Sequence, residues 1–236
     1  MDRRAVQRSM YELQAVSRAP RLMLAASGAL WVMLAWWLLF GAGLQIFGHW
    51  FGRAWTPGDA MRRACLAIGL TIYYIRVLFT AFVFLRRGMG WSEAFTIAPW
   101  MLLMYLLIGI TGGTNAEPFS AVGYIGVVLF LAGSWMNSYA EFTRHVWKQR
   151  PENSGRLYTE GLFRYSRHPN YFGDLVLFLG LCLISGAWIT ALVPLLMLAL
   201  FTFVNVPILD SHLRDHYGPA FDAYAKRTPK LLPFLY

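Results

Sequence analysis

Charged residues are scarce in this chain. They make up 14% of its 236 residues, whereas hydrophobic residues make up 57% and aromatic residues 17%. A soluble domain carries about a quarter charged residues, so the composition argues against a soluble globular protein. Several apolar runs reach the roughly 20 residues that a helix needs to cross the hydrocarbon core of a bilayer. The sequence therefore predicts an integral membrane protein.

Cysteine is also scarce. Cys65 and Cys182 are the two cysteines, and each falls inside or beside an apolar run. This number and placement indicate neither a disulfide framework nor a zinc site. His212 and His216, four residues apart, could bind a metal ion from one helix face, but a third ligand is not evident and we expect no metal site.

Acidic residues are few compared with basic ones. The chain has 12 of the former and 21 of the latter, which gives a net charge of +9. Such an excess can indicate nucleic-acid binding. Here the basic residues lie between the apolar runs, so we expect anionic lipid headgroups and an anionic cofactor as partners, and no nucleic acid.

Apolar runs and short polar segments alternate along the chain. We expect an all-α, polytopic transmembrane bundle of about six spans that forms one membrane domain, residues 1–236, with a basic N-terminal segment at 1–21. The first run is too long for a signal-peptide core and shows no convincing cleavage site, so we interpret it as a retained span. The expected spans cover about residues 22–47, 64–85, 95–112, 119–140, 173–188 and 190–206.

Lysine and arginine are distributed unevenly between the loops, and this bias sets the orientation of a membrane protein. With the N-terminus inside, the inside loops and the C-terminal tail hold most of the basic residues, including Arg86 and Arg87, whereas the outside segment 113–118 holds none. The first outside loop is an exception, with Arg62 and Arg63 among its residues. We expect both termini in the cytoplasm, in a bacterial inner membrane, with an active site that opens to the cytoplasm.

Three groups of polar residues need an explanation, because ionisable side chains within a bilayer are costly and usually face a cavity. The first group is Tyr73, Arg76 and Thr80, which share one face of a helix at positions i, i+3 and i+7. Arg76 could serve a ligand, or it could extend its long side chain to the nearby headgroups.

The second group comprises Asn137, Glu141, Arg144 and Lys148, at the end of the fourth expected span and just beyond it. If the helix continues past the membrane, their spacing places an amide, a carboxylate and two cations along one line. Such a stripe suits a ligand with both hydroxyl and phosphate groups. The alternative is a solvated helix end that ion pairs between neighbouring turns stabilise.

The third group precedes and opens the fifth expected span. Proline is favoured in a first helical turn, so Pro169 places Asn170, Tyr171 and Asp174 near a helix N-terminus. The backbone N–H groups there, together with nearby cations, predict an anion site. These cations come from Arg164, Arg167 and His168. The histidine could act as a general acid or base, or solely as a structural hydrogen-bond donor.

Two stretches of the chain are similar to a known family of membrane proteins. GLFRYSRHPNYFGD (161–174) and HYGPAFDAYAKRTPKLLPFLY (216–236) resemble the C-terminal half of the steroid 5-alpha-reductase-like proteins, in particular their bacterial relatives of the DUF1295 type. Sterol C14 and delta-7 reductases and isoprenylcysteine carboxyl methyltransferases share this half. The resemblance covers residues 135–236, covers 72–87 more weakly, and does not extend over 1–60.

Within the reductases, the resemblance implies an NADPH site in the C-terminal half that opens to the cytoplasm. Asn137 and Glu141 match an Asn-x-x-x-Asp pair that contacts the nucleotide, and Lys148 matches a basic residue near its phosphates. Asn170 and Asp174 match the Asn-x-x-Gly-Glu of the helix opening. The expected cofactor-binding residues also include Arg76, Arg144, Arg164, Arg167, His168, Tyr171, His212 and Tyr217.

At the substrate end, Tyr73 matches the tyrosine that hydrogen-bonds the substrate carbonyl. The reductases pair it with a Glu or Gln from an early helix, for which the first apolar run offers only Gln45. The methyltransferases carry a Glu-Glu pair a few residues before a C-terminal Tyr/Phe-Gly. Counting back from Tyr217, this chain has Leu209 and Asp210 there, and the loss of one carboxylate favours the reductase.

We therefore expect an NADPH-dependent reductase of a carbon–carbon double bond conjugated to a carbonyl, in a sterol-like or isoprenoid lipid. Tyr73 would stabilise negative charge on the carbonyl oxygen, with Gln45 as its helper. The alternative is methyl transfer from S-adenosylmethionine to a lipid or thiol. A third possibility is a lipid-binding or assembly protein that has kept the fold, because fold alone does not decide function.

Overall fold

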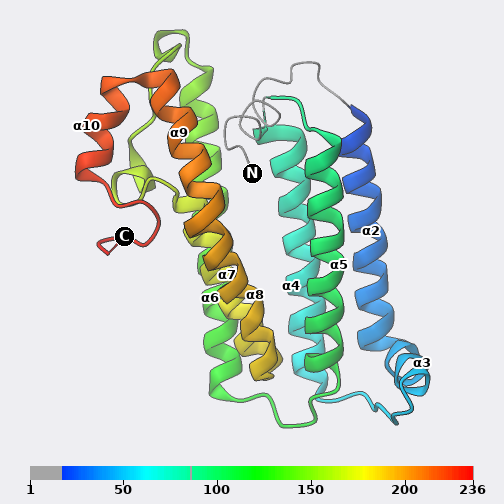
Figure 1. Ribbon diagram of the computed structural model, residues 1–236. Helices are drawn as coiled ribbons and strands as arrows, with labels where there is room; N and C mark the ends of the chain where they lie inside the picture. The colour runs from blue at the N-terminus through cyan, green and yellow to red at the C-terminus, as the bar shows by residue number, and fades with distance from the viewer. Residues whose placement is uncertain (1–17, 86, 236) are drawn as a thin grey trace.

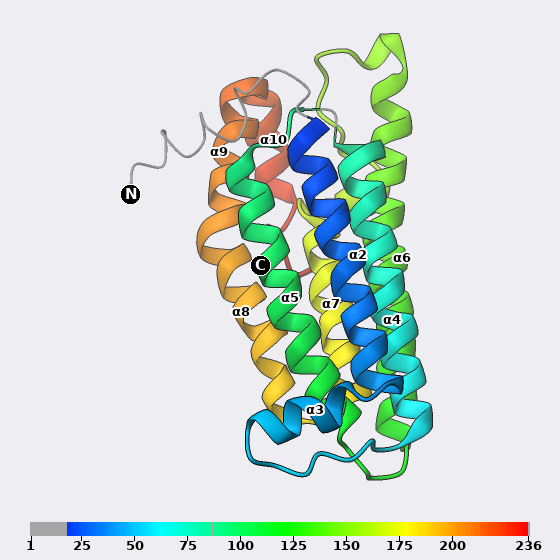
Figure 2. The ribbon, with the colours of Figure 1, turned by 90° about the vertical axis from the view of Figure 1, so that its right-hand side faces the viewer.

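The computed structural model describes residues 18–85 and 87–235. Within these ranges the structure consists of helices and short loops, without a β-strand (Figure 1). The long helices pack side by side as a bundle, with their axes roughly parallel or antiparallel (Figures 1 and 2). The main elements are α2 (Arg18–Phe40), α3 (Gly43–Trp50), α4 (Ala60–Phe79), α5 (Trp91–Gly113), α6 (Ala121–Gln149), α7 (Pro169–Ser185), α8 (Leu192–Leu200), α9 (Val206–Tyr217) and α10 (Pro219–Arg227).

Five helical segments of the described chain are long and apolar enough to cross a membrane. Two of them include a π-helical turn, Thr80–Phe84 after α4 and Phe201–Asn205 between α8 and α9. The five segments are Arg18–Phe40, Ala60–Phe84, Trp91–Gly113, Ala121–Gln149 and Trp188–Tyr217. The fifth expected span corresponds to α7, which is apolar but has only 17 residues. The prediction of a polytopic helical bundle is confirmed.

The N-terminal part of the chain departs from the expected boundaries. Residues 1–17 of the expected basic segment, and Arg86 of the first inside loop, lie outside the described residues. The first apolar run predicts one span to residue 47, but α2 ends at Phe40 and α3 lies across the lower end of the bundle (Figure 2). A Cβ at Gly41 would lie 2.8 Å from the carbonyl oxygen of Trp37, so glycine permits the sharp turn that interrupts the run.

Helix ends elsewhere follow familiar capping chemistry. The Asp59 side chain accepts a hydrogen bond from the backbone N–H of Arg62 (2.8 Å) and so caps the start of α4. Helix α7 begins at Pro169, as the sequence predicts, and ends at Ser185, with Gly186 as its C-cap. Gly186 has a φ of 65°, the left-handed conformation that glycine adopts without penalty. Helix α6 continues to Gln149, so the second polar group does lie on one uninterrupted helix.

Glycines allow α6 and α7 to approach at backbone distance. A Cβ at Gly133 of α6 would lie 2.5 Å from the carbonyl oxygen of Gly173 of α7. A Cβ at Gly173 would in turn lie 2.7 Å from the backbone nitrogen of Asn137. About two helical turns away along the same two helices, Gly126 and Gly180 are equally close. A Cβ on Gly180 would lie 2.6 Å from the carbonyl oxygen of Gly126. Small residues permit such close packing of membrane helices.

Two arginines at the lower end of the bundle account for the exception in the loop charges. Arg62 is 4% exposed and donates to the carbonyl oxygens of Ile184 (2.8 Å) and Glu117 (2.9 Å). Arg63 donates to the carbonyl oxygens of Gly58 (3.1 Å) and Leu39 (2.7 Å). These side chains satisfy helix-end and loop carbonyls, so both arginines have a structural role at this end.

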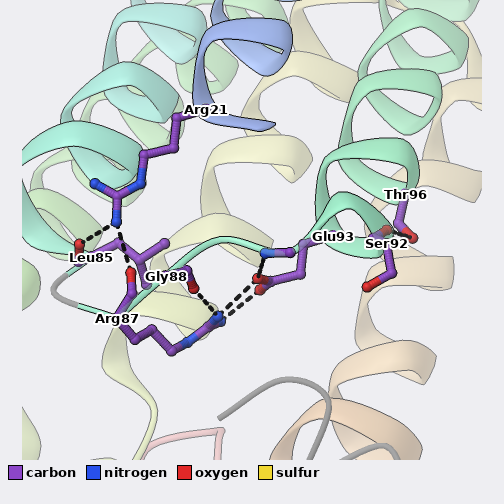
Figure 3. Close-up of polar contacts among 8 residues, drawn as sticks. Arg21, Leu85, Arg87, Gly88, Ser92, Glu93 and Thr96 are labelled. Carbon is purple, nitrogen blue, oxygen red and sulfur yellow. Dashed lines mark hydrogen bonds and ion pairs between the residues drawn. The ribbon is translucent and has the colours of Figure 1, made fainter. Parts of the chain in front are cut away.

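The upper end is joined by a second set of arginine contacts (Figure 3). Arg21 of α2 donates to the carbonyl oxygens of Leu85 (3.0 Å) and Arg87 (2.7 Å). Arg87 pairs with both carboxylate oxygens of Glu93 (2.8 and 2.6 Å), which also accepts from the backbone N–H of Gly90 at the start of α5. Together they tie α2, the segment after α4, and α5.

Candidate functional site

A chain of polar contacts joins α6 to α7, where the glycines bring the two helices together. The Asn137 amide donates to the backbone oxygen of Asn170 (3.0 Å) and to Asp174 (2.9 Å). The Asn170 amide donates to Glu141 (2.9 Å), whose other oxygen pairs with Arg144 at 2.5 Å. Asn137 and Glu141 are 8% and 6% exposed. The structure therefore brings together residues of the second and third polar groups.

Arg76 connects α4 to this chain. Its guanidinium donates to the Asp174 carboxylate at 3.0 Å, and the two side chains are 12% and 21% exposed. The interaction shows that Arg76 turns into the bundle. Two of its nitrogens, Nε and Nη1, are buried without a hydrogen-bond partner, and so is the hydroxyl of Ser134 on α6. Buried polar groups are nearly always paired, so these three atoms are groups that a bound polar ligand could satisfy.

Tyr73 lies one helical turn before Arg76 on the same face of α4. Its ring packs edge-on against Phe178 of α7, with 5.1 Å between the ring centroids. Within the described part of the chain its hydroxyl makes no hydrogen bond, in contrast to Tyr74 and Tyr105, which donate to backbone oxygens of α2 and α4. Tyr73 therefore has a hydroxyl without a described hydrogen bond, one helical turn from the buried Arg76.

A groove of about 470 Å³ lies between α4 and α6 on the side of Arg76. Asn137 and Arg76 are among its lining residues, and most of the remaining lining is apolar and aromatic. Several of these side chains are exposed in the bundle, where a membrane would place lipid: Ile75, Phe79, Trp135, Tyr139 and Phe142. The groove thus offers an apolar surface with a polar edge.

The end of α6 meets the end of α9 above this region. The Lys148 ammonium donates to the Tyr217 hydroxyl (2.8 Å) and lies 5.0 Å from the centroid of the same ring. It also donates to the backbone oxygen of Arg156, in the loop between α6 and α7. A cation that rests on an aromatic face gains from the ring quadrupole. The expected contact residues Lys148 and Tyr217 are therefore adjacent.

Arg167 and His168 form a separate buried cluster around Asp210 of α9. One oxygen of Asp210 pairs with Arg167 at 2.8 Å, and the other lies 2.9 Å from Nε2 of His168. Burial lowers the pKa of His168 below its ordinary value, although the hydrogen bond to Asp210 opposes this shift. The imidazole stacks on Tyr171, which stacks on Phe201. This environment gives His168 the structural hydrogen bond that was one of its two expected roles.

Three expected residues lie apart from these clusters. Gln45 is exposed on α3, at the lower end of the bundle where α4 begins, whereas the helix rise places Tyr73 about 20 Å further along α4. The structure does not bring the two together, because α2 ends before Gln45. Arg164 is exposed on the short turn Gly161–Arg164, and the ring of His212 faces His216 at 6.3 Å. Among the described residues, no group of three potential metal ligands forms.

Sequence reasoning did not include two residues of these clusters among the expected site residues. Asp210 is the carboxylate that contacts both Arg167 and His168. The sequence pointed to it only through its position next to Leu209, where the methyltransferases have the other glutamate of their Glu-Glu pair. Ser134 lies one turn before Asn137 on α6, and its buried hydroxyl has no partner. A serine in an apolar run of the sequence gives no such indication.

Residues 94–228 match the family described as "Protein of unknown function (DUF1295)". Among curated proteins, the chain is 38% identical over 112 residues to the probable O-methyltransferase ustE of Ustilaginoidea virens, which covers 46% of this chain and 38% of that protein. It is 25% identical over 116 residues to protein-S-isoprenylcysteine O-methyltransferase of Schizosaccharomyces pombe, and this match covers 49% of each chain. It is 26% identical over 159 residues to 3-oxo-5-alpha-steroid 4-dehydrogenase 2 of Rattus norvegicus, 67% of this chain and 58% of that protein. The matches span less than two thirds of these relatives.

Proposed function

The chain belongs to the DUF1295 family, and from that premise and the geometry of the site we propose that it is a membrane-embedded, NADPH-dependent reductase. Its substrate would be a lipid-like molecule with a carbon–carbon double bond conjugated to a carbonyl, and its cofactor site would open to the cytoplasm. The observation that carries the proposal is the position of Tyr73. Tyr73 lies one helical turn from Arg76, whose guanidinium keeps two buried and unpartnered nitrogens.

The donor set fits an anionic nucleotide. Arg76 and Ser134 present buried donors without a partner, whereas Lys148 presents a cation at the outer end of α6. An arginine inside the bundle and a lysine at its outer end suit an elongated nucleotide. Its polar groups would meet the arginine, and its phosphates would meet the lysine. We propose that these residues, together with Asn137, Glu141, Arg144, Asn170, Asp174 and Tyr217, hold the cofactor.

NADPH, when bound, would supply a hydride to the beta carbon of the conjugated system, and the alpha carbon would take a proton from water at the cytoplasmic opening to complete the reduction. Tyr73 would donate a hydrogen bond to the carbonyl oxygen, where negative charge develops, and so stabilise the transition state. The Arg76–Asp174 pair would fix the polar end of the site. The apolar groove between α4 and α6 would hold the hydrocarbon part of the substrate and exclude water.

A methyltransferase is the second candidate, and the names of several relatives support it. Several relatives are named O-methyltransferases, including the one at 38% identity. Against it stands the charge of the site, because S-adenosylmethionine carries a sulfonium cation and no phosphate. Lys148 and the ion-paired arginines Arg76 and Arg144 can donate to a pyrophosphate and a 2′-phosphate, groups that S-adenosylmethionine lacks.

Replacement of Tyr73 by phenylalanine tests the proposed mechanism. One lost donor to a developing oxyanion costs on the order of 3 kcal/mol, about a hundredfold in rate. We expect Tyr73→Phe to lower kcat by that factor while NADPH binding stays unchanged. Tyr74→Phe is the matched control, since the Tyr74 hydroxyl donates to Ala25 and not into the site. Equal kcat values for wild type and Tyr73→Phe would remove Tyr73 from the mechanism.

A further inference from the structure

A second cavity lies on α9 and shares no lining residue with the groove between α4 and α6. It has a volume of about 620 Å³ and lies between α9, α10 and the C-terminal segment that follows α10. Its charged lining residues are Arg167, Asp210, Arg214, Asp222, Lys226 and Lys230. A cavity of this size holds a small polar group such as a lipid headgroup.

Hydrogen bonds fix the walls of this cavity. The backbone N–H of Arg167 donates to the carbonyl oxygen of Pro229 (2.9 Å), which holds the C-terminal segment against the loop before α7. The Tyr224 hydroxyl of α10 donates to the carbonyl oxygen of Phe163 in the same loop (2.6 Å). Burial raises the pKa of Tyr224, so this hydroxyl stays a neutral donor. The cavity is therefore formed by packed elements.

The lining carries more positive than negative charge. Asp210 pairs with Arg167 at 2.8 Å, and Asp222 pairs with Arg214 at 2.9 Å, so each carboxylate is already matched by an arginine. Lys226 is exposed and makes no ion pair with any described residue. Arg167 is 7% exposed, and its Nε is buried without a hydrogen-bond partner. A bound anion would supply a partner for these cationic groups.

The cavity lies where the last long helical segment changes from apolar to charged. Residues 192–205 contain no charged residue. In contrast, α9 and α10 supply four of the charged lining residues of the cavity: Asp210, Arg214, Asp222 and Lys226. Large apolar side chains nearby are exposed, with Phe203 72%, Phe234 82% and Leu235 84% accessible. Cationic groups beside exposed aromatic and aliphatic side chains are typical of the membrane–water interface.

We propose that this cavity binds the headgroup of an anionic phospholipid, with the phosphate among Arg167, Arg214 and Lys226. The acyl chains would lie along the exposed apolar side chains of residues 200–204. Basic pockets at a membrane surface bind anionic headgroups through charge, and arginine presents paired N–H groups to phosphate oxygens. A free phosphate would use the same cations but would gain nothing from the apolar surface. This proposal does not depend on which reaction the protein catalyses.

Native mass spectrometry of the full chain in detergent tests the proposal, with phosphatidylglycerol and phosphatidylcholine titrated separately. We expect phosphatidylglycerol to bind more tightly than phosphatidylcholine. Each surface cation near an anionic lipid contributes about fivefold in affinity, so Arg214→Gln and Lys226→Gln should each weaken phosphatidylglycerol binding by about that factor. Arg227→Gln is the matched control, because Arg227 is exposed on the same helix as Lys226 but does not line the cavity.

Three results would contradict the proposal. Equal binding of the two lipids in the wild-type protein would show that the cavity does not select an anionic headgroup, and this comparison needs no variant. An equal loss of affinity in Arg227→Gln would show that net charge, and not the cavity, attracts the lipid. Displacement of phosphatidylglycerol by inorganic phosphate at equal concentration would show that the site takes a free phosphate.

Discussion

Arg76 and Asp174 form an ion pair at 3.0 Å between α4 and α7, within the apolar part of the bundle. The two residues are 98 positions apart in the sequence. Each is costly in a membrane protein without the other, because an unpaired charge in a low dielectric loses its hydration without compensation. The pair therefore holds the candidate site together as well as lining it.

Removal of one partner should destabilise the protein more than removal of both. We expect Asp174→Asn to lower the free energy of unfolding by about 3 kcal/mol, since it leaves Arg76 as an uncompensated buried charge. The double variant Arg76→Gln with Asp174→Asn should recover part of this loss. Thermal unfolding of the purified variants in one detergent measures both effects. Strictly additive losses would show that the two side chains are not coupled.

The close approach of α6 and α7 gives a second prediction. Gly173→Ala places a Cβ 2.7 Å from the backbone of Asn137, so the helices must separate, and we expect a loss of about 1–3 kcal/mol in stability and weaker cofactor binding. Gly109→Ala on α5 is the control, because its Cβ would meet Leu38 at an ordinary 3.6 Å. Equal melting temperatures for Gly173→Ala and wild type would contradict the backbone packing.

Protonation of His168 should make stability depend on pH. Its pKa in the folded protein lies below the ordinary value of 6.5 because the imidazole is buried. The unfolded chain therefore binds a proton that the folded protein does not, and stability should fall as the pH drops below about 6.5. When the pH is lowered from neutral to mildly acidic, we expect the melting temperature of His168→Gln to fall less than that of wild type. His49→Gln, at an exposed position on α3, should behave as wild type, and identical pH profiles for all three proteins would refute the role of His168.

Orientation in the membrane gives a fourth prediction. In a background without Cys65 and Cys182, single cysteines at Ala116 and Ser154, which are both exposed and lie at opposite ends of the bundle, should react with a membrane-impermeant thiol reagent from opposite sides. From the excess of basic residues we predict that Ser154 lies on the cytoplasmic side. Labelling of both positions from one side would contradict this arrangement.

Local sequence patterns predicted much of the bundle and part of the site. Apolar runs indicated the long helices, and the spacing from Asn137 to Lys148 indicated a polar stripe because α6 continues without a break. Pro169 indicated the start of α7. Each of these signals depends on residues within a few helical turns of one another.

Other features depend on contacts between distant parts of the chain, which no local pattern encodes. The partnership of Asp210 with Arg167 and His168 joins α9 to the loop before α7. The end of α2 at Phe40 depends on a tight turn at Gly41 inside an apolar run. The sequence therefore placed Gln45 in the first expected span, as a possible helper of Tyr73. The structure places it on another helix, α3, at the end of the bundle.

The choice of cofactor is the central claim, and calorimetry on the solubilised protein tests it most directly. NADPH, NADH and S-adenosylmethionine are titrated into wild type and into Lys148→Ala. The cations of the site predict that NADPH binds at least about tenfold more tightly than NADH, because its 2′-phosphate adds negative charge, and that added salt weakens binding. Lys148→Ala should narrow that difference by about 1–3 kcal/mol, the range for a hydrogen bond to a charged group. Binding of S-adenosylmethionine without binding of either nucleotide would contradict the reductase and support the methyltransferase.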